Sequence, residues 1–212
     1  MKIIWLGNSS FLIKTSIGKR ILIDPFNILN TFRNDIDVDI ITFSKSSYTN
    51  IEKNSLLKII SSDAMIHQRK FVIYRIALPG YLSFGDDYSG LKRGKNIIYL
   101  YEIDNLKICH LGYLGHILNS ELINILKNCD ILFIPIGGHI CLNGTVANKL
   151  CDLLNPKYIF PMCYKNNSNF YFDDPKSFLS YKRNILLLKN GVIDTSELPN
   201  ESNNLVLFSS YM

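Results

Sequence analysis

The chain opens with Met1-Lys-Ile-Ile-Trp-Leu-Gly-Asn-Ser-Ser-Phe-Leu-Ile13, and after a short turn it continues with Ile21-Leu-Ile-Asp-Pro-Phe26. The apolar residues in these segments are β-branched or alternate with polar ones, which favours strands. The sequence Gly7-Asn8 is a turn signal, and Pro25 ends the last run because proline cannot donate to a strand ladder. The chain is therefore predicted to begin with three strands, Lys2–Leu6, Ser10–Thr15 and Arg20–Ile23.

Beyond these strands, the pattern becomes an alternation of strands and helices. Helices are predicted at Ile51–Ile60, Ser120–Leu126, Thr145–Leu154 and Pro175–Tyr181. Strands are predicted at Asp39–Thr42, Phe71–Ala77, Asn96–Ile103, Lys107–Leu111, Ile131–Pro135, Lys157–Pro161, Asn184–Leu188 and Leu205–Ser209. The stretch Gly80–Gly94, rich in glycine, serine and aspartate, is expected to be a surface loop. Sheets covered by helices, an α/β architecture, follow from this order.

Composition excludes several classes of protein. The chain has 212 residues, 47% of them apolar and 19% charged, which excludes intrinsic disorder and fits a single domain over residues 1–212. No apolar run is long enough to span a membrane, and the first residues do not form a signal peptide, so we expect a cytoplasmic protein. The net charge of +5 is mild and its densest cluster, Lys92–Lys95, is small, so no nucleic-acid partner is expected.

Six segments, taken in order, resemble the metallo-β-lactamase-fold hydrolases, and more narrowly a small bacterial branch similar to ascorbate-phosphate lactonases. The segments are Met1–Ile13, Ile21–Phe26, Arg93–Tyr99, Ile108–His116, Ile134–Gly138, and Leu154–Lys157 leading into Pro161–Lys165. The resemblance implies a four-layer αββα sandwich whose active site lies on loops at one edge of the two sheets. In this family, histidines and aspartates hold two metal ions that activate a bridging water.

At the positions where the family carries its metal ligands, this chain has other residues. The family pattern T-H-x-H-x-D-H reads Thr42-Phe-Ser-Lys-Ser-Ser-Tyr48 here. The seven presumed ligand positions are occupied by Phe43, Lys45, Ser47, Tyr48, Leu82, Tyr113 and Cys163, and we interpret them as a vestigial metal-site pocket. Only the thiol of Cys163 is a good ligand, and Lys45 would repel a divalent ion. The sequence therefore predicts no metal and no other cofactor.

Four further residues are expected at the rim of this pocket: Asn8, Asp24, His116 and His139. His110 and His116 flank the turn Gly112–Gly115, where hydrogen bonds that brace the turn are favoured over metal ligation. His139 follows Gly137-Gly138 and could be a general base, but the sequence shows no partner that would orient it. Cys163 is either a buried inert thiol, the favoured reading, or a nucleophile whose pKa is lowered by Lys45. Aromatic side chains at positions 43, 48 and 113 would fill the vacated space or line a pocket for a small ligand.

The main functional hypothesis is a non-catalytic binding or interaction protein on this scaffold, with no catalytic residue. The alternative is a hydrolase with an altered, metal-free mechanism that uses Cys163 together with Lys45 or His139. A third reading is a subunit that associates with a copy of itself or with an active relative. The expected partners are accordingly a small molecule or a protein, and the sequence identifies neither.

Overall fold

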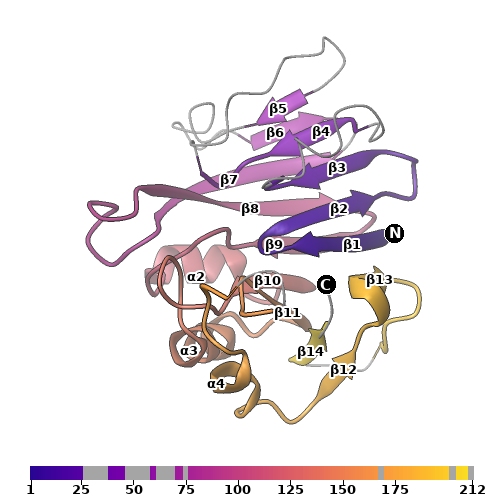
Figure 1. Cartoon of the computed structure of the whole chain (residues 1–212). Coiled ribbons are helices and arrows are strands. Elements are labelled where there is room, and N and C mark those ends of the chain that lie inside the picture. Colours follow the sequence, from indigo (N-terminus) through magenta and orange to yellow (C-terminus); the bar gives the residue numbers. More distant parts are fainter. Residues whose placement is uncertain are drawn as a thin grey trace.

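The computed structural model describes residues 1–25, 38–45, 58–60, 70–73, 76–166, 170–200 and 204–209, the residues at 58–60, 70–73 and 76 by their backbone alone. Two β-sheets lie face to face (Figure 1). One sheet has six strands in the order β13-β1-β2-β3-β4-β5, and the other has eight in the order β12-β14-β11-β10-β9-β8-β7-β6. Both sheets mix parallel and antiparallel pairs.

The six-stranded sheet is built mainly from the opening sequence. Its strands are β1 (Lys2–Gly7), β2 (Ser10–Lys14), β3 (Arg20–Ile23), β4 (Ile40–Thr42), β5 (Lys58–Ile60) and β13 (Val192–Asp194). The first three pair antiparallel, and β4 and β5 then add in parallel to β3. The ends of β3 and β4 therefore meet at the same edge of the sheet.

The eight-stranded sheet contains the longer strands. Its members are β6 (Lys70–Ile73), β7 (Ile76–Phe84), β8 (Lys95–Ile103), β9 (Leu106–His110), β10 (Ile131–Pro135), β11 (Tyr158–Met162), β12 (Ile185–Leu187) and β14 (Leu205–Phe208). Strands β9, β10 and β11 run parallel, so their carboxyl ends also lie together. This arrangement places the loops after β3, β4, β9, β10 and β11 where a site could form.

Aromatic residues fill the space between the two sheets. Phe11 of β2 stacks on Phe133 of β10 with ring centroids 4.0 Å apart, and it meets Phe160 of β11 edge-on at 5.2 Å. Trp5 of β1 packs against Phe160 at 5.5 Å. Such pairs stabilise the core beyond the area that they bury.

Three helices lie together beside the eight-stranded sheet (Figure 1). They are α2 (Ser120–Leu126), α3 (Gly144–Leu154) and α4 (Lys176–Leu179). Helix α3 is capped by the side chain of Asn143, which accepts a hydrogen bond from Val146 N–H, and it buries Ala147, Leu150, Cys151 and Leu154 in the core. No helix in the described part of the chain is long and apolar enough to cross a membrane.

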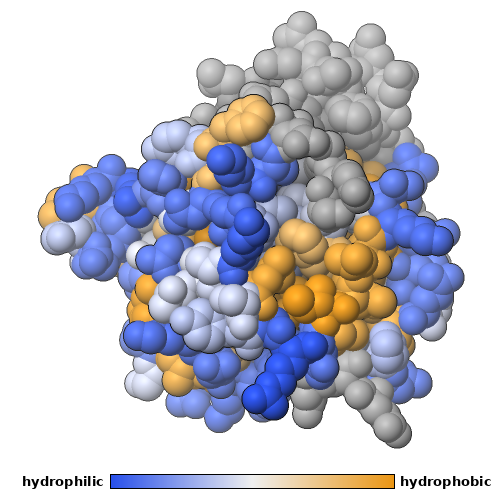
Figure 2. All heavy atoms as spheres, turned by 60° about the horizontal axis from the view of Figure 1, so that its bottom comes forward, coloured by the Kyte–Doolittle hydropathy of each residue, from blue (hydrophilic) through white to orange (hydrophobic). Residues whose placement is uncertain are grey.

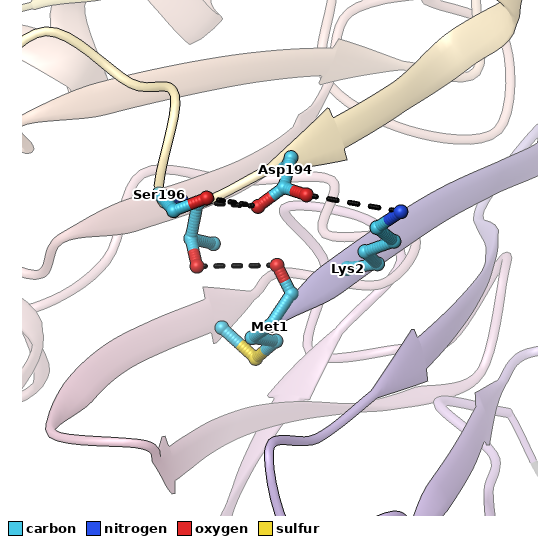
Figure 3. A network of polar contacts seen from close by, with 5 residues as sticks. Met1, Lys2, Asp194 and Ser196 are labelled. Carbon is cyan, nitrogen blue, oxygen red and sulfur yellow. Dashed lines mark hydrogen bonds and ion pairs between the residues drawn. The ribbon is translucent and has the colours of Figure 1, made fainter.

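The start of the chain is joined to β13, which comes late in the sequence (Figure 3). The carbonyl of Met1 accepts hydrogen bonds from the N–H and the hydroxyl of Thr195, and Lys2 pairs with Asp194 at 3.9 Å. Two donors from Ser196 lower the pKa of Asp194, and the charge of Lys2 acts the same way. These contacts tie the edge of the six-stranded sheet to the last quarter of the chain.

Three sequence-based predictions differ from the structure. A helix was predicted at Ile51–Ile60, but Lys58–Ile60 form strand β5; residues 51–57 lie outside the described residues. The strand predicted at Phe71–Ala77 is part of a hairpin of β6 and β7, and the loop predicted from Gly80 begins only after Phe84. Residues 80–84 extend β7 because they pair with the start of β8, a tertiary contact that outweighs the turn-forming residues.

Candidate active site

A cluster of polar and thiol-bearing residues lies at the shared edge where the strands end. Asp24 follows β3, Lys45 follows β4, Tyr113 follows β9 and Cys163 follows β11. Asp24 interacts electrostatically with Lys45 and with Cys163, although the three are far apart in the sequence. The topology has therefore assembled one site from four strand ends.

Asp24 is the buried acid of this cluster and is only 1% exposed. Its Oδ1 accepts a hydrogen bond of 2.6 Å from the N–H of Ser44, which fixes the loop after β4. Burial raises the pKa of Asp24 to about 7, against the opposing effect of the Ser44 N–H and of the nearby hydroxyls of Ser44 and Ser9. The hydroxyls of Ser9 and Ser44 are close enough to act on this pKa, yet neither they nor Asp24 Oδ2 has a hydrogen-bond partner among the described residues. A protonated carboxyl, which can donate to either hydroxyl, suits these surroundings.

Two buried side chains hold the turn after β9. His110 Nε2 donates to the carbonyl of Ser9 at 2.9 Å, and its Nδ1 accepts from Gly112 N–H at 3.2 Å. Burial lowers the pKa of His110 to about 4, so the imidazole is neutral. Asn96 completes the brace, because its Oδ1 accepts from Tyr113 N–H at 2.7 Å and its Nδ2 donates to the carbonyl of Leu111.

Lys45 places a positive charge in the site. Its Nζ lies 4.8 Å from the centre of the Tyr113 ring, a cation–π contact. Burial lowers the pKa of Lys45, and the charge of Arg93 acts in the same direction, while the groups of Cys141, Cys163 and Asp24 oppose this. The ammonium is therefore surrounded by groups that could become negative, and it is partly removed from water.

The thiols beside Lys45 are not activated. Cys163 has no exposed surface, and burial raises its pKa well above the ordinary value. Burial likewise raises the pKa of Cys141 to about 12, although Lys45 acts against this shift. The structure thus opposes the reading of Cys163 as a nucleophile with a lowered pKa and agrees with a buried, unreactive thiol.

A pair of titratable groups stands at the exposed side of the site. His139 Nε2 lies 3.4 Å from Asp173 Oδ1, and both side chains are about half exposed. The ring of Tyr171 lies 5.0 Å from the imidazole, and Asp173 N–H donates to the carbonyl of Gly137. Asp173 is thus the orienting partner that the sequence did not reveal for His139. The charge of Asp173 also raises the pKa of Cys141, and the charge of Lys45 lowers it, so both groups lie near this thiol.

Several residues at this edge have a strained backbone, although others with positive φ lie elsewhere in the described chain. Four residues other than glycine have positive φ here: Asn8 (47°), Asp24 (42°), His139 (47°) and Cys163 (54°). Such conformations cost free energy and persist where the surroundings fix them, often at functional sites. The N–H of Cys163 donates to the carbonyl of Asn8 at 3.3 Å, which links two of the four.

Two residues predicted for the pocket lie elsewhere. Phe43 packs with Leu12, Leu22 and Ile41 in a separate cluster, because successive side chains of a strand point to opposite faces. It therefore does not fill the space beside Tyr113. Leu82 is 41% exposed and outside the polar cluster; its neighbour Ser83 is the buried residue, which accepts from Asn96 Nδ2. Ser47 and Tyr48 lie outside the described residues.

The remaining predicted residues lie around the turns of the site. His116 Nε2 accepts from the N–H of Phe84 at 3.3 Å, and its Nδ1 donates to the carbonyl of Ile117, so it braces the turn. The loop at residues 85–94 is held by Asp86, whose carboxylate accepts from the N–H groups of Tyr88, Gly90, Lys92 and Arg93. This loop is internally ordered by those four bonds.

Fold and site together define a metallo-β-lactamase-type domain. A profile of the family described as "Beta-lactamase superfamily domain" matches residues 2–163, so the chain belongs to this family and has its fold, as the sequence predicted. It is 29% identical to a UPF0173 metal-dependent hydrolase of Thermococcus onnurineus, over 91% of this chain and 98% of that protein. A second relative of the same description, from Pyrococcus furiosus, is 25% identical over 90% and 97%.

Solved structures agree with this assignment. A Thermotoga maritima protein, assigned as a Zn-dependent hydrolase of the metallo-β-lactamase superfamily, has a TM-score of 0.76 at 26% identity and covers 98% of both chains. The metallo hydrolase Igni18 of Ignicoccus hospitalis has a TM-score of 0.58 at 18% identity, over 84% of this chain and 88% of that one, which shows the fold alone. The expectation that this chain is not an enzyme is contradicted by these relatives, which are named hydrolases.

The residues that the structure describes do not fit the metal ions that the relatives' names imply. Within the described ranges, no group of three or more histidine, cysteine, aspartate or glutamate side chains could hold a metal ion. Lys45 adds a positive charge at the strand end, and Tyr113 occupies the neighbouring turn. Since zinc needs three or four protein ligands, we derive no step of the chemistry through a metal here.

Several residues of the site were missed by sequence reasoning. Ser9, Ser44, Asn96 and Asp173 take part through hydrogen bonds or ion pairs that span many residues of sequence. Gly112, with φ of 59°, approaches Asn96 and Ser44 so closely that a Cβ would lie 2.5 Å from each. In the sequence, only the glycine at the start of the turn hints at such a close approach, because glycine is required where no Cβ fits.

Replacing Asp24 with asparagine is expected to change how stability depends on pH. The pKa of Asp24 is about 7 in the folded chain against 3.8 ordinarily, so the folded state holds more protons between these values. The free energy of unfolding of the wild type therefore falls as pH rises through this window, by at most about 1.4 kcal/mol per pH unit from this group. Asparagine removes that term and keeps the acceptor for Ser44 N–H.

Urea unfolding at several pH values between 4 and 8 tests this expectation. The difference in unfolding free energy between Asp24→Asn and wild type should shift in favour of the variant as pH rises. Asp194→Asn serves as the control, because the lowered pKa of Asp194 confines its effect on the pH dependence to values below about 3.8, so its difference from wild type should stay constant from pH 4 to 8. Parallel pH curves for Asp24→Asn and wild type would contradict the raised pKa.

Proposed function

We propose that this chain is a hydrolase of the metallo-β-lactamase superfamily that cleaves a carboxylic ester or lactone without a metal ion. The observation that carries the proposal is the pair of His139 and Asp173 at 3.4 Å. Asp173 and Lys45 both act electrostatically on the Cys141 thiol, which links this pair to the site that contains Lys45. A histidine oriented by a carboxylate is a standard general base. The names of the relatives support hydrolysis as the reaction class.

In this mechanism His139 activates a water molecule. Nε2 is the ring nitrogen that lies near Asp173 Oδ1, so the mechanism places the imidazole proton on Nε2, facing the carboxylate, and leaves Nδ1 as the acceptor. Nδ1 takes a proton from water as the water oxygen bonds to the acyl carbon, and the imidazolium then gives that proton to the leaving alkoxide as its bond to carbon breaks. The products are a carboxylic acid and an alcohol, or a hydroxy acid from a lactone.

Lys45 stabilises the oxyanion that forms when water attacks. Lys45 is half-buried, and a fixed charge in partly water-excluded surroundings stabilises developing negative charge strongly. One cation balances the single charge of an acyl oxyanion. The more highly charged transition state of a phosphodiester generally requires several cations or metal ions, which favours esters and lactones.

Activity of chelator-treated protein on chromogenic esters and lactones tests the proposal. We expect turnover that is unchanged by the chelator and about 100-fold lower in His139→Ala, with a smaller loss in Asp173→Asn. Asp174→Asn is the matched control, since it makes the same change at the adjacent acid, which caps Lys176 N–H instead. Turnover that the chelator abolishes and zinc or manganese restores, or full activity of His139→Ala, would contradict the proposal.

A further inference from the structure

Strand β12 forms an exposed apolar edge of the eight-stranded sheet. It is the first strand in the order of that sheet, and among the described residues it pairs with β14 on one side only. All three of its side chains are exposed: Ile185 by 40%, Leu186 by 39% and Leu187 by 69%. An edge strand with apolar residues on both faces is a ready template for another strand.

The outward hydrogen-bonding groups of β12 are identified by its bonds to β14. Val206 N–H donates to the carbonyl of Asn184 at 3.0 Å, and Leu188 N–H donates to the carbonyl of Phe208 at 2.8 Å. Alternate residues of a strand direct their backbone groups to opposite sides, so Ile185 and Leu187 direct theirs away from β14. Each of these two residues offers one donor and one acceptor to an added strand.

The residues that flank β12 in the sequence carry only positive charges. Residues 181–190 contain Lys182, Arg183 and Lys189 and no acidic residue. Arg183 and Lys189 are exposed and form no ion pair within the described residues. Figure 2, which brings the lower end of Figure 1 forward, shows apolar side chains gathered in a patch with strongly hydrophilic ones beside it. Strand β12 lies at that lower end of the molecule (Figure 1).

We propose that the outer edge of β12 binds an extended acidic segment of a partner protein. The segment adds to the sheet as a further strand, with apolar residues at its centre and aspartates or glutamates toward its ends. Main-chain bonds to Ile185 and Leu187 supply affinity, and the flanking cations Arg183 and Lys189 select the charge.

A second copy of this chain fits the edge less well. An antiparallel pair of β12 strands centred on Leu186 uses the outward groups of Ile185 and Leu187, and it brings Arg183 opposite Lys189 of the other copy. Like charges directly opposite one another destabilise a strand pair. Charge complementarity therefore favours an acidic partner over self-association.

The test uses a labelled ten-residue peptide with valines and isoleucines at its centre and two glutamates at each end. Fluorescence anisotropy with the full chain at low ionic strength should show saturable binding that weakens as salt is added. A peptide of the same sequence, N-methylated on alternate residues along the pairing edge, should not bind. Equal binding of the methylated peptide, or no binding of either, overturns the proposal.

Variants of β12 separate backbone pairing from side-chain contact. Leu187→Pro removes a donor that β14 does not use and should weaken peptide binding about tenfold or more, whereas Leu187→Ala keeps the N–H and much of the affinity. Arg183→Glu together with Lys189→Glu should reverse the preference toward a peptide ending in lysines. If light scattering shows a dimer that Leu187→Pro dissociates, a second copy occupies the edge and the proposal is wrong. Should Leu187→Pro fail to fold by circular dichroism, the N-methylated peptide still decides.

Discussion

Replacing Lys45 with methionine is expected to lower kcat of the hydrolase by about 100- to 1,000-fold, the usual effect of removing one group that stabilises an oxyanion. Methionine keeps an unbranched side chain, one atom shorter than that of lysine, and can make a favourable contact with the Tyr113 ring, so the fold should be retained. The loss would therefore report the missing charge. Lys45→Arg, which keeps the charge, should retain part of the activity.

The pH profile provides a second measurement on the same variant. In the proposed mechanism the active form of Lys45 is the ammonium, and burial lowers its pKa below the ordinary 10.5. Activity of the wild type should accordingly fall as pH rises, with a midpoint below 10.5, and this decline should be missing from the residual activity of Lys45→Met.

Lys92→Met is the matched control for this experiment. Lys92 also lies over a tyrosine, with its Nζ 3.8 Å from the centre of the Tyr88 ring, but it belongs to the loop at residues 85–94. The control should leave kcat and the pH profile unchanged. If Lys45→Met keeps wild-type kcat, or if both variants lose activity equally, Lys45 does not stabilise the transition state.

Sequence reasoning could predict the fold and the chain segments of the site because both depend on the order of the strands. The turns after β9 and β11 come together once the parallel strands of one sheet are paired, and the turn after β4 belongs to the facing sheet. The family pattern placed Lys45, Tyr113 and Cys163 in one site, and the structure brings Lys45 to Tyr113. The resemblance to the family's ligand pattern indicated which residues of these turns face the site.

The errors arose where a shift of one residue along a strand, or a contact with a distant segment, determines which side chains enter the site. A side chain one position along a strand points to the other face, which is why Phe43 and Leu82 left the site while Ser44 and Ser83 joined it. Asp173 reaches His139 from 34 residues away because its N–H bonds to the carbonyl of Gly137. No local pattern in the sequence reports such a contact.

Replacing Gly115 with alanine is expected to cause a large loss of stability, about 4 kcal/mol or more. A Cβ at this position would lie 1.9 Å from the carbonyl oxygen of Gly85, 2.2 Å from its carbonyl carbon and 2.6 Å from the nitrogen of Asp86. All three are backbone atoms, so no side-chain rotation can relieve the clash. The loop is also held by the four bonds to the Asp86 carboxylate, which oppose a shift of its backbone.

Gly94→Ala is the control that separates steric clash from backbone strain. Gly94 has φ of 76°, and a Cβ there would meet no atom within 4 Å. This variant should lose only the free energy that alanine needs to adopt a left-handed conformation, about 1–2 kcal/mol of unfolding free energy. Urea unfolding measures both variants, and circular dichroism detects a Gly115→Ala chain that does not fold at all. Equal stability of the two variants would mean that the turn carrying Tyr113 and the loop carrying Asp86 can move apart. The close contact between Gly115 and Gly85 would then not be needed to hold the turn that carries Tyr113 in place.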